Sequence, residues 1–179
     1  LMDSLTTSQP GYKKKYKGLL YHINKTYDFD AKYLKLKSEK IQKKVLSKDE
    51  VETLIKACNN QRDKFLLRIL WETGFRIGEC LSLWIEDFVI DGHQINLRDR
   101  GALENGAEIK TVASPRTVDV SPDFMNTYMD YLVDYHTDDI DTNFIFFKLS
   151  GPNKGKPLEY ADVDSLFKRL RKKTGIYVT

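Results

Sequence analysis

Apolar residues recur at helical spacing through most of the chain beyond residue 45, and this pattern limits the fold more than any other feature. Ser47 and Glu50 form a capping box, which predicts a helix start because each side chain satisfies a free amide of the first turn. Gly74 and Gly175 are the expected ends of two further helices, since glycine readily adopts the left-handed conformation that closes a helix. Three predicted helices begin at about residues 48, 62 and 122, and two more are predicted over residues 77–84 and 161–173.

A β-rich stretch lies between these helices. Strands are predicted over 94–98, 107–112 and 116–120, with turn sequences at Asp91–Gly92 and Ser114–Pro115. A short buried strand or extended segment is predicted over 144–147. Several helices with one small antiparallel sheet predict an α+β fold that is mainly helical.

The composition is that of a soluble globular protein, with 41% hydrophobic and 31% charged residues. No apolar run approaches the roughly 20 residues of a membrane-spanning helix, so no membrane partner is expected. Residues 1–10 lack the pattern of a secretory signal, and the first residue is Leu, as expected for a piece of a longer protein. Cys58 and Cys80 both fall in apolar segments, which argues against a disulfide framework and favours a reducing cytoplasm.

Charge is distributed unevenly along the chain. Residues 1–50 contain 12 Lys and Arg against 6 Asp and Glu, residues 51–165 contain 12 against 20, and residues 166–179 contain 5 against none. Two basic ends around an acidic middle favour a polyanion partner, with nucleic acid as the leading candidate. The alternative is that the lysine-rich segments are ordinary solvated helix faces.

The first 45 residues differ from the rest of the chain. They hold half of the ten tyrosines, interleaved with lysines, and show no clear apolar face. This predicts a basic linker or the edge of a preceding domain, in which tyrosines stack on bases and lysines neutralise phosphates. In the alternative interpretation, the tyrosines pack on the neighbouring domain. The candidate DNA-binding residues at the two basic ends are Lys13, Lys14, Lys15, Lys17, Lys168, Arg169, Arg171 and Lys172.

Several chemistries have no support in the sequence. His22, His93 and His136 are far apart and lack metal-ligand spacing, so a zinc site is not expected. Neither a Gly-x-x-x-x-Gly-Lys phosphate loop nor a Gly-x-Ser-x-Gly nucleophile elbow occurs. Nucleotide hydrolysis and serine-hydrolase chemistry are therefore not predicted.

The corner after Gly74 places charged residues where they can meet an anion. Arg76 stands at the entry of the next predicted helix, where free amides favour negative charge, and its planar fork suits two phosphate oxygens. Glu79 follows one turn later, where it is suited to support the guanidinium. The alternative is an ordinary helix corner with a surface ion pair, worth roughly a few tenths of a kcal/mol.

A longer pattern around this corner resembles that of a known family. Residues 73–87 read Thr-Gly-x-Arg-x-x-Glu-x-x-x-Leu-x-x-x-Asp, which is similar to the first conserved box of the tyrosine recombinases, the phage integrase family. Residues 108–111 and 116–120 resemble the β-hairpin of that family, which carries a catalytic lysine, and the Leu-Ser-x-x-Glu sequence at 46–50 resembles the usual opening of its catalytic domain. The resemblance covers about residues 44–179.

The resemblance implies a domain division and a set of roles. Residues 1–45 would form a basic linker or the tail end of a core-binding domain, and residues 46–179 the N-terminal part of the catalytic domain. Arg76 matches the arginine that clamps the scissile phosphate, and Glu79 the acidic residue that supports the active site. Lys110 matches the hairpin lysine, a general acid for the departing 5′-hydroxyl. The alternative for Lys110 is a plain exposed strand lysine.

Part of the family pattern is missing. The His-x-x-Arg box, a later His or Trp and the tyrosine nucleophile are expected after the helix that ends near Lys173, and the sequence stops at Thr179. Tyr177 precedes the expected place of that box, so it is not interpreted as the nucleophile. We therefore expect a fragment that holds half of an active site and does not cut DNA alone.

The resemblance implies a site-specific recombinase or integrase of a mobile element, which cleaves and rejoins DNA through a 3′-phosphotyrosine without metal or cofactor. Its expected partner is double-stranded DNA, bound in the cytoplasm by a tetramer of the full-length protein. One alternative is a non-catalytic DNA-binding protein that keeps the recombinase scaffold. Another is a structural helical domain whose basic ends carry no function.

Overall fold

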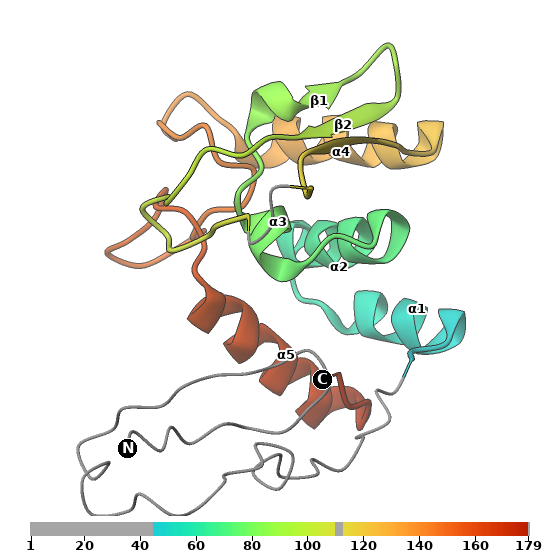
Figure 1. Ribbon diagram of the computed structural model, residues 1–179. Helices are drawn as coiled ribbons and strands as arrows, with labels where there is room; N and C mark the ends of the chain where they lie inside the picture. The colour runs from blue at the N-terminus through green and yellow to red at the C-terminus, as the bar shows by residue number, and fades with distance from the viewer. Residues whose placement is uncertain (1–44, 110–112, 179) are drawn as a thin grey trace, which may run out of the picture. The chain divides into compact units, whose positions relative to one another are not determined.

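The computed structural model describes residues 45–109 and 113–178, all of which lie in one compact unit, Lys44–Thr179. Its helices are α1 (Lys48–Ala57), α2 (Gln61–Thr73), α3 (Ile77–Leu81), α4 (Pro122–Tyr135) and α5 (Tyr160–Thr174), with a 3-10 turn, η2 (Ile85–Asp87). Its strands are β1 (Phe88–Val89), β2 (Gln94–Leu97) and β3 (Arg116–Asp119). The predicted α+β, mainly helical class is confirmed (Figure 1). In these ranges, no helix has the length and apolar character needed to cross a membrane.

The helix ends follow the local signals in the sequence. Ser47 Oγ accepts from the Glu50 amide at 3.2 Å, and the Glu50 carboxylate accepts from the Ser47 amide at 3.0 Å, so the predicted capping box is confirmed. Gly74 and Gly175 end α2 and α5 in the left-handed conformation, with φ of 66° and 71°. Ser121 caps α4, whose first residue is a proline.

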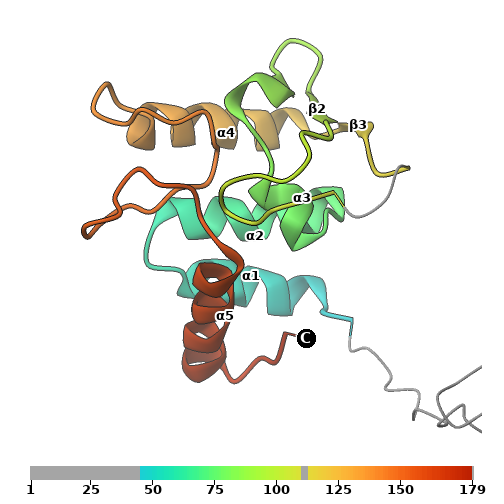
Figure 2. The ribbon, with the colours of Figure 1, turned by 60° about the vertical axis from the view of Figure 1, so that its left-hand side comes forward.

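Helix α2 lies between α1 and α4, and α5 packs against α1 (Figures 1 and 2). Phe65 of α2 is the centre of the core, with its ring centroid 5.4 Å from that of Phe124, 5.1 Å from Tyr131 and 5.8 Å from Phe146. These rings come from α2, α4 and the buried segment 144–147, so one aromatic cluster joins parts of the chain that are distant in sequence. The segment predicted over 144–147 is buried as expected, but it forms isolated bridges at Phe144 and Phe147 with a bend between them rather than a strand.

The predicted third helix is wrong at its C-terminal end. Helix α3 stops at Leu81, where Ser82 Oγ donates to the Glu79 carbonyl oxygen at 2.9 Å. Trp84 is extended, and its amide donates to the Asp87 carboxylate at 2.9 Å, which starts the turn η2. Side chains that bond locally to the backbone therefore replace the helical bonds that the apolar spacing predicted.

The sheet is antiparallel, with the order β1-β2-β3. Ile95 of β2 is opposite Phe88 in β1 and Val118 in β3, and its side chain is fully buried. The strands predicted over 94–98 and 116–120 are confirmed within a residue at their ends, and β1 was missed because two residues are too few to show an alternation.

The strand predicted over 107–112 is not found at residues 107–109, and residues 110–112 lie outside the described ranges. Asn105 fixes this part of the chain instead. Its side-chain amide donates to the Leu81 and Leu158 carbonyl oxygens at 3.0 and 2.9 Å, and its Oδ1 accepts from the Ala107 amide at 3.1 Å. The segment is therefore bound to the end of α3 and the approach to α5 rather than to a neighbouring strand.

Candidate active site

The turn between α2 and α3 places Arg76 at the surface. Gly74 reverses the chain, and Thr73 Oγ1 accepts from the Phe75 amide at 3.1 Å. Phe75 is thereby buried in the core, while Arg76 becomes the N-cap of α3 with an extended backbone. The Arg76 side chain is 65% exposed, so its guanidinium is accessible to a ligand in solution.

Glu79 lies beneath Arg76 and is almost completely buried, with a side chain 2% exposed. Its Oε2 accepts from the Arg76 amide at 2.9 Å, and its Oε1 accepts from Arg76 Nη1 at 3.0 Å. One carboxylate therefore satisfies a free amide of α3 and also holds the side chain of the residue that begins it. The sequence placed these two residues one turn apart, and the structure brings them into direct contact.

Arg116 of β3 completes this group, which we call the arginine–glutamate cluster (Arg76, Glu79 and Arg116). Arg116 Nη2 and Nη1 donate to Glu79 Oε2 and Oε1 at 3.1 and 3.3 Å. Nη1 also donates to the Ser114 carbonyl oxygen at 2.8 Å, and the guanidinium lies 4.9 Å from the Phe75 ring centroid. Arg116 was not predicted as a site residue, because no local spacing joins it to a carboxylate 37 residues earlier.

The cluster is electrostatically unbalanced, with two guanidinium groups around one carboxylate. Burial alone would raise the pKa of the Glu79 carboxyl, but hydrogen bonds from Arg116 and Arg76 outweigh it and hold that pKa below its ordinary value. Glu79 is therefore ionised at neutral pH and offsets only one of the two positive charges. The remaining positive charge, next to the exposed Arg76 side chain, is suited to binding a phosphate group.

Gly78 allows two other segments to approach α3. A Cβ atom at Gly78 would overlap the Tyr160 hydroxyl and lie 3.2 Å from the Glu108 carbonyl oxygen. The backbone at Glu108 therefore lies against α3 at Gly78, which is two residues after Arg76 in the sequence. Lys110 itself lies outside the described residues, so its predicted role stays a prediction.

The polar loop over residues 99–105, which precedes Glu108, is held by a buried ion pair. The Asp87 side chain is fully buried, and Arg100 donates to both of its oxygens, from Nη2 at 2.7 Å and from Nη1 at 3.0 Å. The Arg100 guanidinium also lies 4.3 Å from the Trp84 ring centroid. The bonds of Arg100 to Asp87 and of Asn105 to the backbone therefore fix the two ends of this loop, which is longer than a tight hairpin needs.

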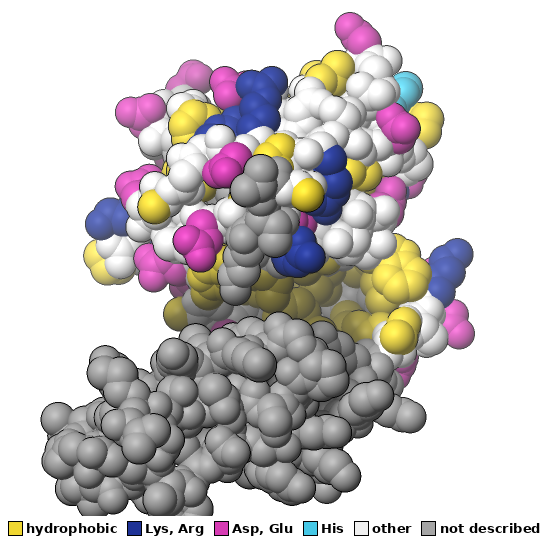
Figure 3. Space-filling view, viewed as in Figure 1, with side chains coloured by type: hydrophobic (Ala, Val, Ile, Leu, Met, Phe, Trp, Pro, Cys, Tyr) yellow, Lys and Arg dark blue, Asp and Glu magenta, His cyan; other side chains and the backbone are white. Residues whose placement is uncertain are grey.

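The basic residues predicted on the last helix are exposed on α5, and none of them pairs with a member of the arginine–glutamate cluster. Lys168 pairs with Asp164 at 2.7 Å, and the Arg171 guanidinium lies 4.0 Å from the Tyr177 ring centroid. Arg169 and Lys172 are exposed on the same helix. The other DNA-contact candidates, Lys13, Lys14, Lys15 and Lys17, lie outside the described residues. On the face drawn in Figure 3, Lys and Arg side chains are interspersed with Asp and Glu.

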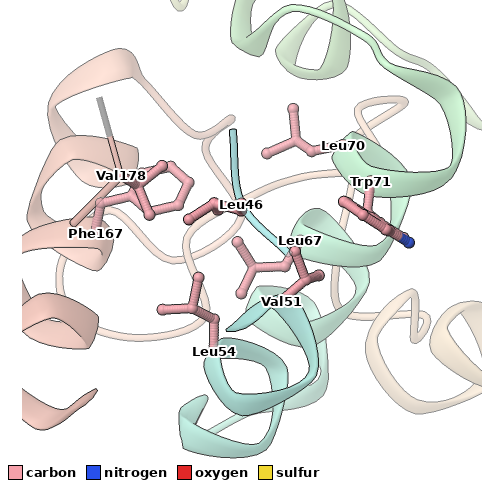
Figure 4. Close-up of a pocket in the computed structure, with 8 residues that line it drawn as sticks. All are labelled: Leu46, Val51, Leu54, Leu67, Leu70, Trp71, Phe167 and Val178. Atoms are coloured by element: carbon pink, nitrogen blue, oxygen red, sulfur yellow. The ribbon is translucent and has the colours of Figure 1, made fainter. Parts of the chain in front are cut away.

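A pocket of about 160 Å³ between α1, α2 and α5 is a poor candidate for catalysis. Figure 4 shows its lining, which is apolar throughout: Leu46, Val51, Leu54, Leu67, Leu70, Trp71, Phe167 and Val178. A second pocket, of about 220 Å³, has a charged rim that includes Lys64, Arg68, Asp130 and Asp134. Neither pocket contains a member of the arginine–glutamate cluster.

The thiols of the chain are unsuited to nucleophilic chemistry. Cys58 and Cys80 are free and buried. Burial, together with the charge of Asp63, raises the pKa of Cys58 to about 11, and burial raises the pKa of Cys80 well above its ordinary value. Both therefore stay protonated at neutral pH. Among the described residues, no group of three or more His, Cys, Asp or Glu side chains is arranged to hold a metal ion.

Comparison with known proteins agrees with this arrangement. The matched region, residues 44–179, makes up most of the chain, and it matches the model of the phage integrase family. The chain therefore belongs to the phage integrase family, the tyrosine recombinases.

Two relatives show where in that family the similarity lies. Transposase A from transposon Tn554 of Staphylococcus aureus is 39% identical over 166 residues, which cover 93% of this chain and 45% of the transposase. The tyrosine recombinase XerA of Pyrococcus horikoshii is 36% identical over 84 residues, which cover 43% of this chain and 30% of XerA. The chain thus spans less than half the length of these relatives.

Solved structures confirm the fold. The crystal structure of XerA recombinase matches with a TM-score of 0.57 at 25% identity, over 75% of this chain and 45% of that one. The Tn1549 transposon integrase, in complex with transposon right end DNA, matches with a TM-score of 0.65 at 21% identity, over 85% of this chain and 51% of that one. The helices and small sheet described above are thus those of a tyrosine recombinase catalytic domain.

Proposed function

We propose that the full-length protein is a site-specific DNA recombinase of a mobile element. The observation that carries this proposal is the exposed Arg76 guanidinium, held at the N-terminus of α3 by the buried Glu79 carboxylate in a site with excess positive charge. The similarity to a transposase and to a transposon integrase bound to DNA supports the choice of a mobile element and of DNA as the partner.

In the proposed reaction, a tyrosine oxygen attacks the scissile phosphorus, and the bond from phosphorus to the 5′-oxygen breaks. Arg76 binds the nonbridging oxygens and stabilises the charge that they gain in the transition state. Glu79 keeps Arg76 in place and takes no proton, because its pKa is already low. Lys110 gives a proton to the departing 5′-oxygen.

The tyrosine nucleophile and the His-x-x-Arg box are proposed to belong to sequence that follows Thr179. The chain spans 45% of the length of the Tn554 transposase, so a longer protein of that kind has room for these residues. The 179-residue chain alone is then expected to bind DNA without cutting it.

The proposed partner is double-stranded DNA, bound in the cytoplasm by a tetramer of the full-length protein. The basic residues of the first 45 positions and the exposed side chains of α5 would neutralise backbone phosphates. The excess charge of the arginine–glutamate cluster would bind the scissile phosphate alone, whereas the basic residues of the first 45 positions and of α5 would bind phosphates along the duplex.

The role of Lys110 is tested with a substrate whose scissile phosphate carries sulfur in place of the bridging 5′-oxygen. Because a thiolate leaves without a proton, loss of a general acid matters only on the ordinary substrate. We expect Lys110→Ala in the full-length protein to slow cleavage of ordinary DNA by roughly 10² to 10⁴ and to approach the parent rate on the sulfur-substituted DNA. Equal defects on both substrates would assign Lys110 to DNA positioning.

Arg76→Ala is the matched control in that experiment, because an arginine that stabilises nonbridging oxygens gains no special relief from the sulfur. The competing function is that of a non-catalytic DNA-binding protein on the same scaffold. It predicts that the coding sequence after Thr179 lacks the His-x-x-Arg box and a tyrosine after it, and that the full-length protein forms no covalent complex with DNA.

A further inference from the structure

Two arginines share one buried carboxylate in the arginine–glutamate cluster, and they do so unequally. Arg116 donates to both oxygens of Glu79, at 3.1 and 3.3 Å, whereas the Arg76 side chain donates only to Oε1, at 3.0 Å. Within the described ranges, only one of the two terminal nitrogens of the Arg76 guanidinium, Nη1, thus donates to Glu79. Its Nη2 and Nε make no hydrogen bond to the described residues, so they are the donors that an anion would meet.

Arg116 is itself held from two further directions. Its Nη1 donates to the Ser114 carbonyl oxygen at 2.8 Å, and its guanidinium lies over the buried Phe75 ring. Its side chain is 35% exposed, against 65% for Arg76. Of the two arginines, Arg116 is the restrained one and Arg76 the one that faces solvent.

The geometry points to Arg116 as a positioning residue for Arg76. This inference rests on the proposed function, in which Arg76 clamps the scissile phosphate. By pairing with both oxygens of Glu79, Arg116 prevents Arg76 from closing its own two-pronged pair with that carboxylate. Arg76 therefore stays anchored through Nη1 while its other N–H groups remain available to phosphate oxygens.

Charge leads to the same role. With Arg116 present, two guanidinium groups face one carboxylate, and one positive charge remains to stabilise the transition state. Without Arg116, Arg76 and Glu79 form a neutral pair in which the N–H groups of Arg76 donate to Glu79 rather than to a phosphate. The change acts on the Arg76 side chain although Arg116 lies on a different element, β3, and need not touch the DNA.

The first part of the test measures the cluster without DNA, in the 179-residue chain. The Glu79 carboxyl is titrated by carbon-13 NMR in the parent, Arg116→Ala, Arg116→Lys and Thr117→Ala. Among the described residues, the groups that face Glu79 are Arg76, Arg116 and the adjacent Cys80 thiol, which burial keeps protonated. We expect the pKa of Glu79 to rise in Arg116→Ala, to rise less in Arg116→Lys, and to stay unchanged in Thr117→Ala.

Thr117→Ala is the matched control because Thr117 is the next residue of β3, with an exposed side chain whose hydroxyl donates to Asn96. Should Arg116→Ala fail to fold, Arg116→Lys decides the question, since it keeps the charge and loses the fork. An unchanged Glu79 titration in a folded Arg116 variant would overturn the inference.

The second part uses the full-length protein and its recombination site. We expect Arg116→Ala to slow formation of the covalent protein–DNA complex by about 10- to 100-fold at saturating DNA, because it misplaces a clamp, while DNA affinity is unchanged. Arg116→Lys restores part of the rate. A positioning role through Glu79 also predicts that Glu79→Gln with Arg116→Ala is about as slow as the slower single variant.

The outcomes separate this inference from the proposed function. A loss of DNA affinity in Arg116→Ala, with the cleavage rate at saturation unchanged, would make Arg116 a DNA contact and overturn the positioning role. Additive losses in the double variant would do the same. If the parent protein forms no covalent complex at all, the proposed function fails, while the titration still reports whether Arg116 governs Glu79.

Discussion

Gly78 of α3 lies directly against the hydroxyl of Tyr160, the first residue of α5. The two residues are more than eighty positions apart in sequence, and their contact brings the start of α5 to the helix that Arg76 begins. Glu108 reaches the same point through its carbonyl oxygen. Three segments that matter for the site therefore meet where one residue has no side chain.

This contact predicts the effect of Gly78→Ala. In most helices alanine is favoured over glycine by about 0.5–1 kcal/mol. Here the added methyl group overlaps the Tyr160 hydroxyl and crowds the Glu108 backbone, so we expect the free energy of unfolding to fall by about 1 kcal/mol. Urea unfolding of the 179-residue chain measures the change.

Tyr160→Phe provides the control, because it removes the hydroxyl and keeps the ring. Gly78→Ala is expected to cost less in the Tyr160→Phe background than in the parent chain. A stabilising effect of Gly78→Ala in the parent would contradict the close contact.

The buried ion pair between Asp87 and Arg100 predicts a large loss on truncation. Arg100→Ala removes both bidentate bonds from a carboxylate that has no access to water, so we expect unfolding to become easier by about 3 kcal/mol. Arg98→Ala is the matched control, since Arg98 is 52% exposed and lies 3.6 Å from the same carboxylate. Its cost is expected to stay below about 1 kcal/mol, and equal costs for the two variants would contradict the account.

Stability is expected to fall in acid partly because of Glu79. Burial works against ionisation of Glu79, but Arg116 and Arg76 hold its pKa below the ordinary value of about 4.3 of the unfolded chain. Its contribution is therefore fully present above that unfolded pKa and is lost as the pH falls through the lower pKa of the folded state.

The measurement is the free energy of unfolding from pH 7 down to pH 3, for the parent and for Glu79→Gln. We expect the parent to be the more stable near neutral pH and the difference between the two to shrink on acidification. A difference that is constant over this range would show that the charge of Glu79 adds nothing to stability.

Binding of DNA by the 179-residue chain is expected to be weak, nonspecific and strongly dependent on salt. Replacing Lys13, Lys14, Lys15 and Lys17 together by Gln removes up to four phosphate contacts, and each one lost lowers the salt slope of binding by about 1. Lys168→Gln with Lys172→Gln tests α5 in the same way. An unchanged slope would show that the altered residues do not touch the DNA backbone.

Much of the fold was readable from local sequence signals. The capping box at Ser47, the stop at Gly74 and the proline after Ser121 act within one helical turn, so the sequence alone predicts them. The end of α3 and the segment at 107–109 were predicted wrongly, because Asp87 and Asn105 bind backbone groups there that no periodicity reveals.

The candidate site divides in the same way. Arg76 and Glu79 are three residues apart, and a family-like pattern marks them both. Arg116 reaches Glu79 only through the pairing of β3 with β2 and the packing of the sheet near α3, so its part in the site is a product of tertiary structure. In the sequence, Arg116 was marked only as the start of a predicted strand in a hairpin-like stretch after the Ser114–Pro115 turn, which does not connect it to Glu79.

In the proposed reaction Arg76 clamps the phosphate at which DNA is cut, and the decisive variant for this role is Arg76→Lys in the full-length protein. Lysine keeps the positive charge and loses the planar fork. The measurement is the rate of covalent protein–DNA complex formation at saturating DNA, together with the affinity for the same DNA. We expect the rate to fall on the order of 10² to 10³ with affinity retained. Cleavage at the parent rate by Arg76→Lys would show that Arg76 is not the phosphate clamp.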